Sequence, residues 1–400
     1  MNNKVESMPM IETFEYSGLP SRVLCAPDSV ERLADEVRRL GCSRVLLLTG
    51  RRSGQSKLAK AVKLLLGDLL ADSFDGVVEH SSVSMVNEVG QRARDGRIDL
   101  LLAVGGGSPS DTAKGVAILL AEGAPLEQHA GSFTPPDNIV QRELHKPKIP
   151  IIVIPTTASA AEVTPGLGIR DEQGHKLLFW DTKLIPRVTI LDPAANLEVP
   201  THLMTTSSMN ALAHCIEGLY SKRRNPISEG LALHSIRLLT TGLRAMIRNP
   251  QSVDARARIL SGAHMSGMVI GNTRVCIHHA ICHCLGGLGG LSHGVANSIM
   301  LPHAMRFNLP FAGDKLALSA SAFGVNVQGL SEAEAAQSAI QAVENLQREI
   351  GVPRRLQDTA LSHDLLEAIA DYAMNDRGLY YNPGPTPTRQ DVLKLLEAAW

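Results

Sequence analysis

The sequence lacks the features that mark secreted, membrane and nucleic-acid-binding proteins. No apolar run approaches the roughly 18 residues that a membrane-spanning helix needs, and the start, MNNKVESMPMIETFEY, has no apolar core or small-residue cleavage site of a secretory signal. The formal net charge is −1, so no basic field is available to hold nucleic acid or an anionic membrane. We therefore expect a cytoplasmic protein whose partner is a small-molecule substrate.

Cysteine is also scarce, with six residues in a chain of 400. Six cysteines in a chain of this length do not form a disulfide framework, which belongs to short secreted domains. Cys276, Cys282 and Cys284 raise the alternative of a structural zinc site, but their spacing lacks the C-x2-C pairs typical of such sites. We interpret them as small buried residues in a reducing compartment.

The two halves of the chain differ in their secondary-structure signals. Before residue 200, short runs of Val, Ile and Leu alternate with helical patterns, and this order predicts a doubly wound α/β domain with a parallel sheet. The predicted strands are residues 43–50, 76–83, 97–107, 149–157 and 187–193. A helix is predicted over residues 28–41, and the Pro-rich polar stretch 133–150 is interpreted as an exposed loop.

After about residue 200 only helical patterns are found. Residues 331–350 form a clear example, because Ser331 and Glu334 make a capping box and Gly351 supplies a stop signal. Four hundred residues exceed what one hydrophobic core usually holds. We therefore predict an α/β dinucleotide-binding domain over residues 1–198 and an all-helical metal and substrate domain over residues 199–400.

A glycine-rich loop follows the strand predicted at 97–107. The stretch GGGSPSDTAK leaves the backbone bare where a strand turns into a helix, so the first helical N–H groups can hold a phosphate. A second loop of small polar residues, PTTASAAEVTP, follows the strand at 149–157, and ligands of open α/β sheets bind beyond such strand ends. The predicted cofactor-binding residues are Gly105, Gly106, Gly107, Ser108, Asp111, Lys114, Thr156 and Thr157. The alternative is that both loops are ordinary tight turns.

Histidines cluster in the second half, within HHAICHCLGGLGGLSHG at residues 278–294. His279 and His283 are four residues apart and share a helix face, as do Asn210 and His214 in SSMNALAHCIEGLY. His293 follows a glycine-rich break that can fold back toward the helix. Imidazoles from two helices and a loop suit a divalent transition metal. The alternative is a set of histidines satisfied in the core or at the surface.

Four stretches, GGGSPSDTAK, IPTTASAAEVTP, MNALAHCIE and HHAICHCLGGLGGLSHGVANSIMLPHAMRFN, resemble the iron-containing (group III) alcohol dehydrogenase family. The resemblance implies an α/β dinucleotide-binding domain followed by a helical domain, with the active site between them. It implies NAD(P)H as cofactor and Fe2+ or Zn2+ bound by an Asp and three His, which match His214, His279 and His293. His283 would lie near the nicotinamide and relay a proton. We also expect a homodimer.

This chain departs from the family pattern at the position of the ligand Asp, which is Asn210. Asn210, the short PTTASAAEVTP loop and the HHxxCH pattern resemble the maleylacetate reductases. The main prediction is an oxidoreductase, metal-assisted, that transfers hydride between NAD(P)H and an alcohol–aldehyde or alcohol–ketone pair. The alternatives are a maleylacetate reductase-type reduction of an unsaturated oxo acid, and a family member that binds nucleotide without catalysis.

The sequence also predicts that the enzyme accepts NADPH. The first predicted strand ends at Gly50, where an acidic side chain would take the ribose hydroxyl of NAD in many dinucleotide domains. Arg51 and Arg52 follow instead, and a guanidinium can pair with the 2′-phosphate of NADPH. The alternative is that both arginines only face solvent.

Overall fold

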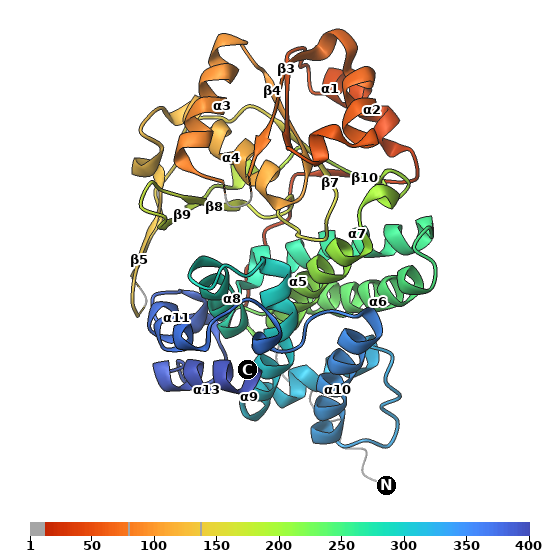
Figure 1. The fold of residues 1–400 in the computed structure, drawn as a ribbon, viewed down its shortest axis with the longest axis vertical. Coiled ribbons are helices and arrows are strands. Elements are labelled where there is room, and N and C mark those ends of the chain that lie inside the picture. The colour runs from red at the N-terminus through yellow and green to blue at the C-terminus, as the bar shows by residue number, and fades with distance from the viewer. Residues whose placement is uncertain (1–12, 79–80, 137) are drawn as a thin grey trace.

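A parallel sheet forms the centre of the first half of the chain. The computed structural model describes residues 13–78, 81–136 and 138–400, and Figure 1 shows an α/β part above a helical part. Among these residues the main sheet has six parallel strands in the order β1-β10-β7-β4-β2-β3. Its strands are β1 (Arg22–Cys25), β2 (Val45–Gly50), β3 (Leu70–Val77), β4 (Leu100–Gly105), β7 (Ile151–Pro155) and β10 (Val188–Leu191).

Helices cover both faces of this sheet. The bounds are α1 (Leu33–Arg39), α2 (Lys57–Leu66), α3 (Val83–Asp95) and α4 (Gly107–Glu122). Alternate residues of β2 point to opposite faces: Leu47 packs in the core that contains α1 and α2, and Leu46 packs in the core that contains α3 and α4. The central strands are buried on both faces, which explains their continuous apolar runs. The predicted doubly wound α/β class is confirmed.

One of the five predicted strands was wrong. The range 76–83 covers only the end of β3, and α3 begins at Val83 behind its cap Ser82; residues 79 and 80 lie outside the described part. The run of apolar residues used to predict strands does not occur in β3, because β3 lies at the sheet edge and mixes polar and apolar residues over Leu70–Val77. The other edge strand, β1, was not predicted because it has only four residues, three of them exposed.

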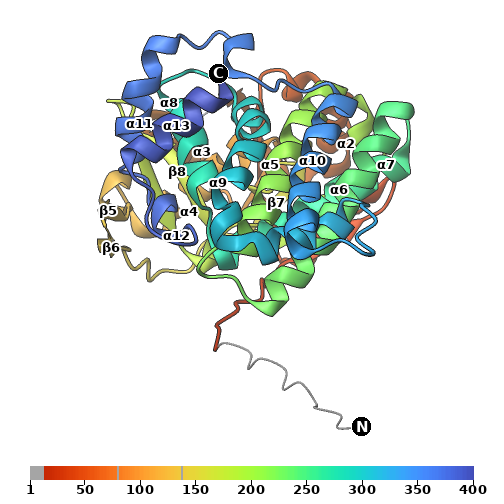
Figure 2. The ribbon, with the colours of Figure 1, turned by 90° about the horizontal axis from the view of Figure 1, so that it is seen from below.

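Two antiparallel hairpins extend from the α/β part. They are β5 (Ser132–Thr134) with β6 (Asn138–Val140), and β8 (Gly166–Arg170) with β9 (Lys176–Trp180). The expected loop at 133–150 therefore begins as a hairpin, which is a correction: prolines and polar residues occur in short exposed strands too. Figures 1 and 2 show this hairpin beside the helical part, where Phe133 meets Tyr380 edge to face at 5.4 Å.

The helical part contains, in the described residues, no strand after β10. Its helices are α5 (Thr201–Tyr220), α6 (Pro226–Arg248), α7 (Val253–Thr273), α8 (Ile277–Gly287), α9 (His293–Ala322), α10 (Glu332–Ile350), α11 (Leu366–Ala373), α12 (Gly378–Tyr381) and α13 (Arg389–Ala399). The capping box of Ser331 and the left-handed Gly351 bound α10 as predicted. Helix α5 is buried along most of its length, because α6, α7 and α9 pack around it. No described helix is long and apolar enough to cross a bilayer.

Candidate active site at the junction of the two parts

The glycine loop joins β4 to α4 at the carboxyl edge of the sheet. Gly105 has φ +145°, and a side chain on it would meet the Pro109 ring at 3.0 Å, so glycine is required there. Gly106 is the N-cap of α4 and supplies no side-chain hydrogen bond to the helix end. The first N–H groups of α4 are therefore without a side-chain cap, which is the arrangement that accepts a phosphate.

The second loop, residues 156–165, lies directly against the glycine loop. Thr156 N–H donates to Gly105 C=O at 2.8 Å, and a side chain on Gly106 would contact the Thr157 hydroxyl at 3.4 Å. Both threonines and Ser108 are half-buried. The structure therefore brings the two predicted loops together at one edge of the sheet, and their contact with a cofactor stays a prediction.

Lys114 has a different position from the one that its motif suggests. Its side chain is fully buried, and Nζ donates to the carbonyls of Ala161, Thr164 and Gly166 at 2.6, 2.8 and 3.1 Å. All three donors of the ammonium are thus used by the second loop. Lys114 organises that loop, and Asp111, one turn earlier on α4, is the more exposed of the two.

The predicted histidines meet where α5, α8 and α9 approach the second loop. The His214 and His279 rings stack at 4.9 Å, and the His283 and His293 rings stack at 5.9 Å. The His279 ring lies 5.6 Å from that of His293 and 6.0 Å from that of His283. The four side chains that the spacing placed on two helices and a loop therefore form one cluster. Burial lowers the pKa of His214, His279 and His293 well below the usual value, so these rings are neutral.

Glu217 and Asn210 contact the imidazole of His279, which lies at the centre of the cluster, on its two ring nitrogens. The Glu217 carboxyl contacts Nδ1 of His279 and accepts the N–H groups of Cys276 and His279 at 2.9 and 3.2 Å. Asn210 Oδ1 lies 3.0 Å from Nε2 of His279, and its amide donates to Ser159 C=O at 3.3 Å. Burial raises the pKa of Glu217 to about 7, against the opposing effect of His278. A proton is therefore retained between Glu217 and His279 near neutral pH.

His283 differs from the buried histidines because its side chain is 27% exposed. Its Nδ1 lies 2.7 Å from Asp376 Oδ2, and Asp376 Oδ1 accepts the N–H of Gly378 at 2.7 Å. Burial would raise the pKa of Asp376, but the charge and hydrogen bond of His283 and the Gly378 N–H outweigh it, so that the pKa is lowered. Sequence reasoning missed Asp376, because 93 positions separate it from His283 and no motif links them.

The predicted metal ligands form a set without charge. Three neutral imidazoles and the amide oxygen of Asn210 offer no anion to a divalent ion, and although three imidazoles alone hold Zn2+ in some catalytic sites, a carboxylate or thiolate strengthens the binding of Fe2+ and Zn2+. In the described residues, the group of His, Cys and acidic side chains whose ligand atoms all lie within 4.8 Å is Glu217, His278 and His279, which omits His214 and His293. The residues present therefore fit such an ion less well than a set with a carboxylate, because Asn210 contributes only a neutral oxygen.

Comparison with known proteins agrees with this architecture. The profile of the iron-containing alcohol dehydrogenases matches residues 20–193, and that of the C-terminal part of the same family matches residues 204–400. The chain is 32% identical to lactaldehyde reductase of Escherichia coli K12 over 93% of its length and 96% of the relative. It is 34% identical to maleylacetate reductase 2 of Cupriavidus pinatubonensis, over 95% of both chains.

Solved structures show the same relationship. A 1,3-propanediol oxidoreductase superposes with a TM-score of 0.90 at 29% identity, over 97% of this chain and 100% of that one. A maleylacetate reductase from Agrobacterium tumefaciens superposes with a TM-score of 0.81 at 28% identity, over 98% and 99%. A parallel-sheet part followed by a helical part is the architecture of a class of oxidoreductases. The chain belongs to the iron-containing alcohol dehydrogenase family, and it is an enzyme of that class.

Proposed function

We propose that the enzyme reduces a carbonyl group with NADPH or NADH as hydride donor. The observation that carries this proposal is the pair of His283 and Asp376 beside the histidine cluster. Asn210 joins this cluster to the second predicted cofactor loop through its bond to Ser159 C=O. In the reaction, hydride passes from the nicotinamide to the carbonyl carbon and a proton passes to the carbonyl oxygen. The products are an alcohol and the oxidised cofactor.

His283 is the proposed proton donor. Asp376 accepts the hydrogen bond of Nδ1–H, and among the described residues nothing bonds Nε2 of His283. The carboxylate holds the ring in one orientation and leaves Nε2 to face the reactant, which is the arrangement of a general acid. The neutral buried rings around it provide N–H groups and dipoles without adding competing positive charge.

The cofactor is proposed to place its phosphates at the N-terminus of α4. Uncapped N–H groups at Gly107 and Ser108, and glycines that a side chain would crowd, support this position. Thr156 and Thr157 would contact the same molecule from the second loop. Arg51 and Arg52, which are exposed just after β2, are proposed to favour the 2′-phosphate of NADPH.

No step is assigned to a metal, because Asn210 leaves the donor set without charge. The same residue favours a second candidate function, the reduction of a carbon–carbon double bond next to a carbonyl in an unsaturated oxo acid, because Asn210 resembles the pattern of the maleylacetate reductases, to which the chain is similar. Hydride would then add to the alkene carbon and the His cluster would meet the charge of the enolate. A homodimer also remains a proposal.

The test is oxidation of NADPH and NADH by the purified enzyme with lactaldehyde and with maleylacetate, each compared with the His283→Ala variant. Turnover of lactaldehyde that His283→Ala lowers at least about tenfold supports the main proposal. Turnover of maleylacetate without turnover of lactaldehyde supports the second candidate function. Binding of NADPH without turnover of either substrate, or turnover that His283→Ala leaves intact, contradicts the proposed chemistry.

A further inference from the structure

Arg256, on α7, is a buried cation whose guanidinium donates to neutral groups. The residue is 1% exposed. Its Nη1 donates to Oδ1 of Asn196 at 3.1 Å, and its Nη2 donates to Val199 C=O at 3.1 Å. Arginine is rarely buried this far unless a carboxylate pairs with it, yet both of these acceptors are uncharged oxygens. The position of Arg256 therefore needs an explanation in what the amide of Asn196 does.

Asn196 carries this contact to the second loop. Its Nδ2 donates to Thr156 C=O at 2.9 Å. Because a guanidinium is only a donor and a carbonyl only an acceptor, the amide oxygen must face Arg256 and the amide nitrogen must face Thr156. The N–H of Thr156 donates in turn to Gly105 C=O. The bonds therefore form a continuous path from the helical part to both predicted cofactor loops.

The linker that carries Asn196, residues 192–199 between β10 and α5, is itself held firmly. The carboxylate of Asp192 accepts two N–H groups of the segment that follows β1, at 3.2 and 3.0 Å. The carboxylate of Glu198 accepts two N–H groups of the first turn of α2, at 3.1 and 2.9 Å. A side chain mounted on such a supported segment holds its partner at a defined position.

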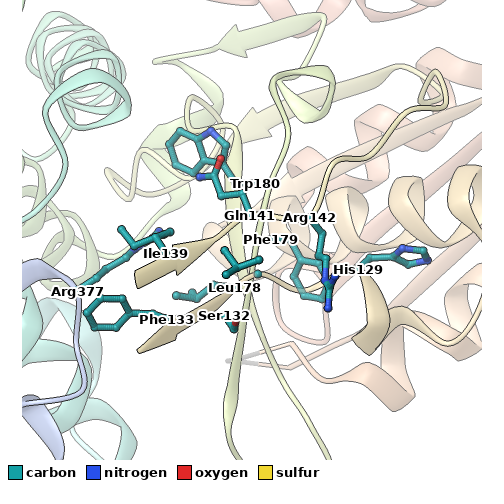
Figure 3. Close-up of a pocket in the computed structure, with 12 residues that line it drawn as sticks. His129, Ser132, Phe133, Ile139, Gln141, Arg142, Leu178, Phe179, Trp180 and Arg377 are labelled. Carbon is teal, nitrogen blue, oxygen red and sulfur yellow. The ribbon is translucent and has the colours of Figure 1, made fainter. Parts of the chain in front are cut away.

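A pocket at the β5–β6 hairpin is separate from this path. Figure 3 shows its walls, which include Phe133, Leu178 and Trp180, with Arg377 at one side. The described residues that line it include none from the second loop or the linker. Its volume of about 30 Å³ corresponds to about one water molecule, so a dinucleotide does not fit there. The pocket is therefore not an alternative cofactor site.

We propose that Asn196 is a positioning residue for the cofactor, and that Arg256 fixes its amide in the orientation that holds Thr156. Hydrogen bonds to the N–H and the C=O of Thr156 fix the peptide planes on both sides of its Cα, and with them the direction of its side chain. The inference rests on the proposed function, in which Thr156 contacts the cofactor. It goes further by assigning part of the cofactor affinity to two residues that are at most 2% exposed and do not touch the cofactor.

The variant Asn196→Asp separates the two bonds of this side chain. A carboxylate still accepts from Arg256, whose charge keeps it ionised, but it has no N–H for Thr156 C=O. We expect the Kd of NADPH to rise at least about fivefold, the smaller effect of a lost buried hydrogen bond. In steady-state kinetics the KM of the cofactor should rise with it. The kcat at saturating cofactor should stay within about twofold, because only binding is affected.

Two further variants accompany this one. Ser235→Ala is the matched control: it removes the buried 2.7 Å bond of Ser235 Oγ to Gly262 C=O on α7, and the Kd of NADPH should stay within about twofold. Arg256→Lys keeps the buried charge but loses the planar fork, so it should also raise the Kd, and it tests the link if Asn196→Asp does not fold. Urea unfolding of all three compares their losses of stability.

Thr156→Val tests whether Asn196 acts through Thr156. Removal of the hydroxyl should itself weaken NADPH binding, and Asn196→Asp should then add little to the loss, since both changes affect one contact. Additive losses would overturn the inference, as would a Kd that neither Asn196→Asp nor Arg256→Lys changes while Thr156→Val raises it. A Kd that Thr156→Val leaves unchanged would contradict the cofactor contact in the proposed function and overturn the inference together with it.

Discussion

Asp376 holds the imidazole of His283 through a 2.7 Å hydrogen bond between Oδ2 and Nδ1. The two residues come from α8 and from the turn before α12, and they meet because α12 packs against α8. A carboxylate in this position fixes which ring nitrogen faces a reactant.

Substitution of His283 or Asp376 should lower kcat, and the loss should be larger for His283. We expect His283→Ala to lower kcat at least about tenfold, the low end of general acid–base contributions, while the Kd of the cofactor stays unchanged. Asp376→Asn should lower kcat less, because the amide can still orient the ring. Steady-state kinetics and cofactor titrations test both. Unchanged kcat in His283→Ala would remove this residue from the mechanism.

Asn210→Asp should raise metal affinity. The change adds one charged oxygen to three imidazoles, the donor set that Fe2+ and Zn2+ prefer. Titration of each metal into both proteins measures the difference, and Asn210→Ser is a control that adds no charge. Equal affinities of the wild type and Asn210→Asp would mean that this residue does not contact the ion.

The double change Arg51→Ala, Arg52→Ala should weaken NADPH more than NADH. Both arginines are exposed after β2, where a guanidinium can reach a 2′-phosphate. We expect the ratio of kcat/KM for NADPH to that for NADH to fall at least about tenfold, the size of one charge-assisted hydrogen bond. A wild type that favours NADH tenfold or more would contradict the argument from Gly50, and an unchanged ratio would show that the arginines only face solvent.

Arg274→Gly should be more stable than Arg274→Ala. Both variants lose the guanidinium and its contact with the Trp180 ring, but only glycine adopts the φ 68°, ψ 160° of this position, at the end of α7, without strain. The strain is worth about 1–3 kcal/mol, and the greater chain entropy of glycine offsets roughly 0.5–1 kcal/mol of it. Urea unfolding should therefore give a free energy of unfolding about 1 kcal/mol larger for Arg274→Gly. The reverse order would show that this backbone is not strained.

Asp111→Asn should stabilise the cofactor-free enzyme at alkaline pH. Burial raises the pKa of Asp111 to about 6 in the folded protein, although Lys114 and Lys176 oppose the shift. The folded state therefore binds the proton more tightly than the unfolded chain, and stability is lost as pH rises from about 4 to about 6. Thermal unfolding should favour the variant at about pH 8, with a difference that shrinks toward pH 4. The effect is modest, because the side chain is 26% exposed, and a constant difference across this range would contradict the shift.

The central fold was readable from the sequence because its strands are buried on both faces. Leu100–Gly105 and Ile151–Pro155 are unbroken apolar runs followed by loops of distinctive composition, so both strand and loop signals agree. The edge strands β1 and β3 carry exposed polar residues and lack that signal. The β8–β9 hairpin gave no signal that distinguished it from a loop.

The histidine cluster was predictable from helical spacing, since His279 and His283 on α8 share one face with one turn between them. The acidic residues that contact these histidines could not be predicted from the sequence. Asp376 reaches His283 from the last thirty residues of the chain, and Glu217 contacts His279 from another helix. Tertiary packing alone brings these residues together.

The three hydrogen bonds of Lys114 have a consequence for how the second loop meets a ligand. Residues 161–166 have little regular structure of their own, yet one ammonium group ties three of their carbonyls to the rigid helix α4. The conformational entropy of this loop is therefore lost during folding. A molecule that enters beside Thr156 finds a loop whose shape is already set, so little of its binding free energy is consumed in ordering the backbone.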